Sequence, residues 1–60
     1  MQQEADELVE SWHNGNLSYV IALVIGQQNA ARSALLSAFI FSQLSEHDRM
    51  VFLRMLKDRI

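Results

Sequence analysis

An apolar stripe with a helical period marks the start of the chain. Its members, at positions i, i+3, i+4 and i+7, are Ala5, Leu8, Val9 and Trp12. Acidic residues crowd the first turns of this stretch, where the helix dipole favours negative charge. Gly15 follows, and glycine readily adopts the left-handed conformation that ends many helices. The pattern predicts an amphipathic helix over about residues 3–13.

The next segment is apolar on every side. Residues 19–25 are rich in β-branched side chains, so periodicity alone does not separate a buried strand from a buried helix. A lone strand would leave its backbone groups unpaired, and the chain has no second strand-like run. Asn16 or Ser18 can cap a helix here and Gly26 can end it. We predict a helix over residues 17–25, with strand pairing between subunits as the alternative.

Two further helices are predicted in the second half of the chain. Asn29 can open a helix that is apolar nearly all round and runs to about residue 44. It carries a stripe of small residues, Ala30, Ala34 and Ala38. Ser45 and Asp48 match a capping box at the start of a last helix over residues 46–59. The residues of this helix expected to face the core are Val51, Phe52, Met55, Leu56 and Ile60.

The length of the chain bears on how this all-α fold is stabilised. A single domain of 60 residues buries only about 60% of its unfolded surface, and the absence of cysteine rules out disulfides. Two short amphipathic helices do not cover two central helices that are apolar all round. We therefore expect a small bundle of three to four helices that forms an intertwined homodimer, with a closely packed monomer as the alternative. The predicted core and dimer-interface residues are Trp12, Val20, Leu23, Val24, Leu35, Phe39, Ile40, Phe52 and Leu56.

Charge restricts the classes of partner. The net charge of −2 lacks the basic excess typical of nucleic-acid-binding domains. Gly26, the polar residues 27–29 and Arg32 divide the apolar centre into pieces too short to span a membrane. The N-terminus lacks the basic and apolar regions of a signal peptide, so a cytoplasmic protein is expected.

Few residues suggest chemistry. Glu10 and His13 have the i, i+3 spacing found in di-metal helical bundles, but Glu10 lies off the apolar stripe and His13 is at a helix end. His47 falls in the capping turn of the last helix, and no nucleophile with a neighbouring base is evident. We expect no metal, no cofactor and no enzymatic activity. Trp12 is expected in the core rather than at an interface with another protein.

Two functional hypotheses remain. The first is a non-enzymatic regulatory module that acts as a homodimer and binds another protein, the chain itself being a small accessory protein of the kind that mobile genetic elements encode. The alternative is a small dimeric DNA-binding regulator, because segment 18–35 has the outline of a helix-turn-helix. The polar tip that would carry recognition in this segment consists of Gln27, Gln28, Asn29 and Arg32.

Overall fold

Four α-helices make up the chain in the computed structural model, which describes residues 1–59. They are α1 (Gln2–His13), α2 (Leu17–Ile25), α3 (Ala30–Gln43) and α4 (Glu46–Arg59). Each begins and ends within one residue of its predicted position, so the all-α prediction is confirmed. The ambiguous apolar run is a helix and not a strand. Ile60, predicted to face the core, lies outside the described residues.

The two glycines end their helices in different ways. Gly15 has a φ of +92°, and its N–H donates to the carbonyl of Trp12 at 3.0 Å. The N–H of Asn16 donates to the carbonyl of Ser11 at 3.0 Å, which completes a Schellman motif. Gly26 follows α2 with an ordinary φ of −79°. Its small size matters instead, because a Cβ there would lie 3.1 Å from the carbonyl oxygen of Ala22.

Side chains cap the last two helices as predicted. The Asn29 carboxamide oxygen accepts a hydrogen bond from the N–H of Arg32 at 2.9 Å. The Ser45 hydroxyl accepts one from the N–H of Asp48 at 3.2 Å, which is one of the two arms of a capping box. Asn16 occupies the N-cap position of α2, but its side chain makes no capping hydrogen bond.

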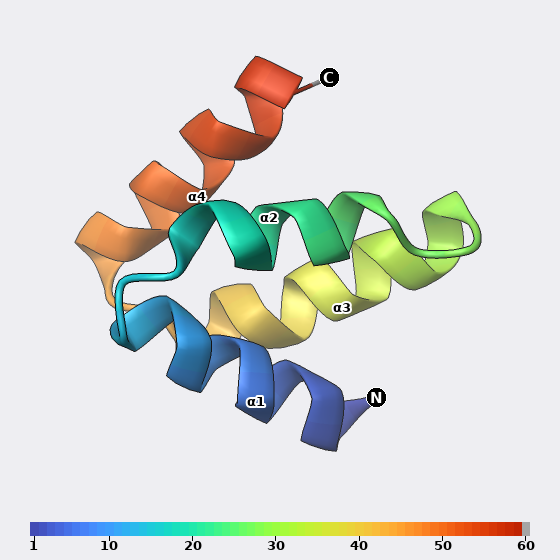
Figure 1. Ribbon diagram of the computed structural model, residues 1–60, viewed down its shortest axis with the longest axis horizontal. Helices are drawn as coiled ribbons and strands as arrows, with labels where there is room; N and C mark the ends of the chain where they lie inside the picture. Colours follow the sequence, from blue (N-terminus) through green and yellow to red (C-terminus); the bar gives the residue numbers. More distant parts are fainter. Residues whose placement is uncertain (60) are drawn as a thin grey trace.

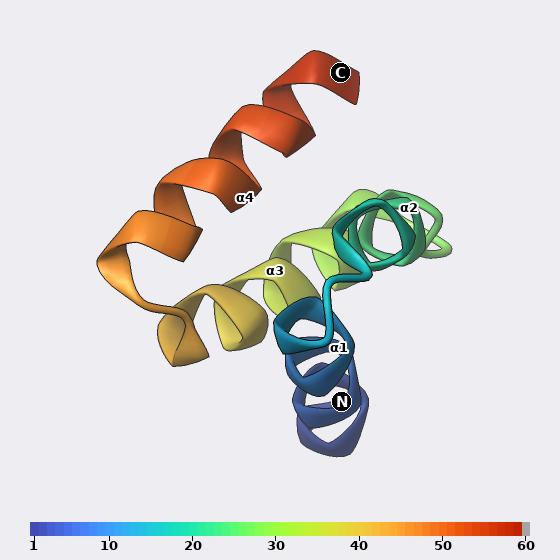
Figure 2. The same ribbon diagram turned by 60° about the vertical axis from the view of Figure 1, so that its left-hand side comes forward.

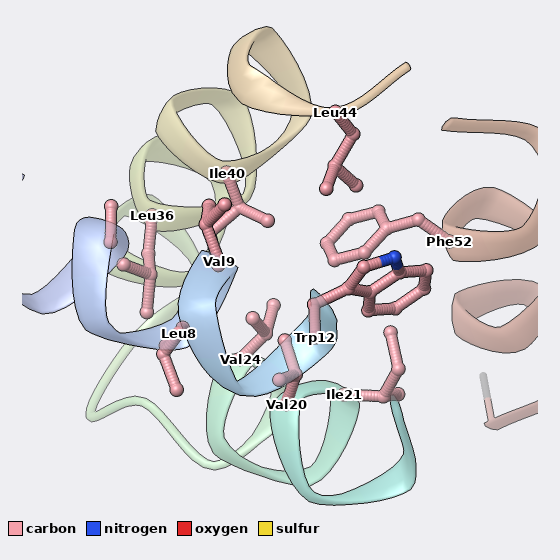
Figure 3. Packing of buried hydrophobic residues seen from close by; sticks show 11 residues of the cluster. Leu8, Val9, Trp12, Val20, Ile21, Val24, Leu36, Ile40, Leu44 and Phe52 are labelled. Carbon is pink, nitrogen blue, oxygen red and sulfur yellow. The ribbon is translucent and has the colours of Figure 1, made fainter. Parts of the chain in front are cut away.

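An entirely apolar core joins all four helices (Figure 3). At one side of it the Phe52 ring packs against Trp12, with ring centroids 5.6 Å apart, and against Phe41 at 6.4 Å. The buried residues are Ala5, Leu8, Val9, Trp12, Val20, Ile21, Val24, Leu36, Ile40, Leu44 and Phe52. Trp12 is thus a core residue, as the sequence suggested. None of the described buried residues is polar, so no buried polar group fixes how the helices pack against one another.

The helices form a packed group of three and a projecting fourth (Figure 1). α1 packs on α2 and α3, and the Gln43 side chain links α3 to α1 by donating to the Asp6 carboxylate at 2.8 Å. α4 packs mainly on α2 and diverges from α3 beyond the corner that joins them (Figure 2). At that corner the Arg49 Nε donates to the carbonyl of Phe41 at 2.9 Å.

Candidate interaction groove

A groove opens where α3 and α4 diverge. It consists of two adjoining hollows of about 460 and 390 Å³, which share Ala34, Ser37 and Leu56. The residues that line it come from the end of α2, the turn after it, α3 and α4: Ile25, Gln27, Asn29, Ala30, Ser33, Ala34, Ser37, Ala38, Phe41, Ser42, Arg49, Phe52, Leu53 and Leu56. The groove therefore follows almost the whole length of α3.

The sequence of α3 explains why the groove stays open. The positions that face it repeat at intervals of three and four residues, and all but Phe41 are alanine or serine. Such short side chains do not reach across to α4. On α4, Phe52 turns into the core, and Leu53 remains 52% exposed on the opposite wall. The predicted stripe of small residues thus lines an open surface instead of a tight helix–helix contact.

The polar side chains in the groove are already engaged within the chain. The Ser37 hydroxyl donates to the carbonyl of Ser33 at 2.7 Å, and the Ser33 hydroxyl donates to the carbonyl of Val24 at 2.8 Å. Ser42 donates to the carbonyl of Phe39 at 2.9 Å, and the Gln27 amide donates to the carbonyl of Leu23 at 2.8 Å. Because these donors are used internally, the groove presents a surface suited to apolar groups.

Within the part of the chain that the structure describes, Arg49 is the one ionisable residue that lines the groove. Its guanidinium carbon lies 5.2 Å from the centroid of the Phe41 ring, and Nη2 donates to the carbonyl of Ser42 at 3.3 Å. The guanidinium thus donates hydrogen bonds to free backbone carbonyls at the C-terminal end of α3.

The predicted core and interface residues divide into three groups. Trp12, Val20, Val24, Ile40 and Phe52 are buried, and Phe39 and Leu56 are half-buried. Leu23 and Leu35 face outward, with exposed fractions of 38% and 51%. Ile21, Leu36 and Leu44 are buried but were not among the predicted interface residues. The spacing of Ile21 and Leu36 relative to Val24 and Ile40, three and four positions, is the signal that could have selected them.

The groove residues on α3 and α4 were only partly anticipated. The sequence predicts the alanine stripe, but it does not associate Arg49 and Leu53 with that stripe. The i, i+4 step from Arg49 to Leu53 places them on one side of α4, but no sequence signal indicates that this side faces α3.

The predicted recognition tip is split by the structure. Gln27 and Asn29 line one end of the groove, whereas Gln28 is exposed and does not line it. The guanidinium of Arg32 lies 3.8 Å from the carboxylate of Glu4 on α1. The single cation of the central segment therefore faces the most acidic helix of the chain, which weakens its attraction for phosphate.

Residues 1–59 contain no group of three or more His, Asp or Glu side chains that could hold a metal ion. Glu10 and His13 are both exposed at the end of α1. Within the same residues, no helix has the length and apolar content needed to cross a membrane. No family model matches the chain, and no curated protein or solved structure matches it either.

Proposed function

We propose that this chain is a non-enzymatic protein-interaction module that works as a homodimer and binds an apolar helix of a partner protein in the groove between α3 and α4. The observation that carries the proposal is the groove itself, an apolar channel whose polar side chains already make hydrogen bonds within the chain. A ligand that needs polar recognition finds few donors there, whereas an apolar surface loses no hydrogen bond on entering.

The dimensions of the groove suit a helix. α3 has 14 residues and is therefore about 21 Å long, the length of four turns. Its alanine and serine side chains allow the backbone of a second helix to approach closely. Phe41 and Leu53 stand on either side and supply larger apolar contacts. Helix-in-groove binding uses such a surface, with apolar anchors on one face of the bound helix.

The composition of the exposed surface supports the homodimer, whereas the total accessible area does not. The accessible surface is 4058 Å², close to the roughly 4000 Å² expected for a compact monomer of this mass. Among residues 1–59, six large apolar side chains nevertheless remain exposed, namely Tyr19, Leu23, Ile25, Leu35, Met50 and Leu53. Scattered apolar residues are common on protein surfaces, but six on so small a chain favour a partner.

Charge favours protein over DNA as the partner. The chain carries a net charge of −2, and Arg32, the cation best placed for the helix-turn-helix hypothesis, lies beside Glu4. The other acids of α1 (Asp6, Glu7 and Glu10) are exposed. A duplex that approached α3 from this side would meet an acidic helix.

A substitution in the groove tests this function. In Ala34→Arg, a long charged side chain enters the shared part of the two hollows, whereas Ala31→Arg places the same side chain on an exposed position of α3 outside the groove. We expect tagged wild type and Ala31→Arg to retain the same partner from the native host and Ala34→Arg to lose it. Retention of that partner by all three chains, or by none, would contradict the proposal.

A further inference from the structure

A second surface on α4 has a pattern of its own and shares only Leu53 with the groove. Glu46, Met50, Leu53 and Lys57 follow one another at intervals of four, three and four residues, so they form a single stripe along the helix. Met50 and Leu53 are 64% and 52% exposed, and Glu46 and Lys57 are exposed as well. Among residues 1–59, neither Glu46 nor Lys57 forms an ion pair.

The order of residue types makes this stripe self-complementary. An acid stands at its N-terminal end, a base at its C-terminal end, and two large apolar side chains lie between them. If a second α4 is laid against it in the opposite direction, Glu46 of each copy meets Lys57 of the other. In the same register, Met50 of each copy meets Leu53 of the other. The spacing of the four residues is that of a coiled-coil seam, in which such pairs form successive layers.

We infer that a second copy of the chain packs its α4 antiparallel against this stripe, about a two-fold axis that passes between Met50 and Leu53. The inference rests on the proposed homodimer and names its interface. Isologous contacts require a surface that is complementary to itself, and the charge order of the stripe meets that requirement. Antiparallel packing also places the opposite ends of the two helix dipoles side by side.

The seam leaves the rest of the fold in place. Phe52 points into the core of its own copy, so each copy keeps its own core and the two copies lie face to face instead of intertwined. The groove side of α4 presents Arg49, Phe52 and Leu56, and only Leu53 belongs to both surfaces. Since one helix from each copy covers less than the roughly 800 Å² per partner of a standard interface, we expect a micromolar Kd.

Charge reversal tests this interface, because a variant that merely unfolds more easily would not regain dimerisation when mixed with its charge-reversed counterpart. Glu46→Lys would bring two like-charged pairs together in its homodimer, and Lys57→Glu would do the same with opposite sign. We expect each single variant to dimerise about tenfold more weakly than wild type at low salt, as measured by sedimentation equilibrium. An equimolar mixture of the two should form a heterodimer about as tight as the wild-type homodimer, and the double variant should recover as well.

Asp58→Lys is the matched control, because it changes the net charge by the same amount on a side of α4 away from the stripe. We expect its Kd to stay within about twofold of wild type. If both single variants dimerise like wild type, the seam is wrong while the homodimer stands. If wild type stays monomeric across the micromolar range, the seam and the homodimer both fail. In either case Ala34→Arg tests the groove independently.

Discussion

The two ends of the chain are attached to the fold by very different amounts of contact. α1 has 12 residues and buries four of them, Ala5, Leu8, Val9 and Trp12. α4 is longer, with 14 residues, and buries one, Phe52. A helix of this length is marginal by itself, so most of its stability has to come from packing. The apolar side chains that α4 leaves outside are therefore the part of the molecule in which a binding surface is to be expected.

Phe52→Ala should destabilise the protein more than any other substitution considered, because it removes the main contact between α4 and the core. Removal of a fully buried phenylalanine lowers the free energy of unfolding by about 3–5 kcal/mol, a large share of what a chain of this size possesses. Urea denaturation followed by circular dichroism measures the change. Trp12, the sole tryptophan and a neighbour of Phe52, should shift its emission to longer wavelength as water reaches it.

Leu53→Ala is the control for that experiment, since it removes an exposed apolar side chain from the next position of α4. In solution dilute enough for the chain to be monomeric, it should change the free energy of unfolding by no more than about 0.5 kcal/mol. Equal losses for the two variants would mean that the Phe52 ring is not the main anchor of α4.

Gly15→Ala should cause the next largest loss of stability, at the turn that follows α1. The φ of +92° at Gly15 is strained for alanine, so the turn between α1 and α2 should lose about 1–2 kcal/mol. Gly26→Ala should have a smaller effect, because its φ is ordinary and only a 3.1 Å approach to a carbonyl has to relax. Thermal unfolding of both variants gives the order, and a larger loss at Gly26 would contradict it.

Asn29→Ala removes the side chain that caps the start of α3, the helix that forms one wall of the groove. Loss of its capping hydrogen bond to the N–H of Arg32 should lower the free energy of unfolding by about 1 kcal/mol. Asn16→Ala is a matched control at the start of α2, where the side chain makes no capping hydrogen bond. Denaturation curves should show a clearly smaller loss for Asn16→Ala, and equal losses would count against the capping role of Asn29.

Arg32→Ala should have the smallest effect. The Arg32 guanidinium and the Glu4 carboxylate are both well exposed, so their separation of 3.8 Å contributes little to stability, and we expect a change within about 0.5 kcal/mol. The same variant tests the DNA hypothesis. Neither wild type nor Arg32→Ala should shift random duplex DNA in a gel at low salt. A wild-type shift that weakens with salt and with this substitution would restore the helix-turn-helix interpretation.

The helix boundaries could be predicted because the signals for them are local. Gly15, Asn29 and Ser45 stop or start their helices through contacts with residues no more than four positions away. The apolar run 17–25 could be assigned because the chain offers no second strand to pair with it.

The inward faces of α2 and α3 could not be predicted with the same success. Both helices are apolar nearly all round, so periodicity does not select a side. Leu23 and Leu35 are as apolar as Ile21 and Leu36, yet the first two are exposed and the last two are fully buried. That choice depends on where α1 and α4 pack. The groove depends on the corner at residues 44–45, whose angle is not encoded in any pattern of apolar positions.

In the dimer proposed here, α4 is held chiefly by the fully buried Phe52 ring and uses its exposed apolar stripe to bind a second copy of the chain. Sedimentation equilibrium of the wild-type chain over the micromolar range, with circular dichroism on the same samples, tests it most directly. We expect a helical protein whose average mass rises with concentration from 6.9 kDa towards twice that value. A helical protein that remains at 6.9 kDa throughout would contradict it.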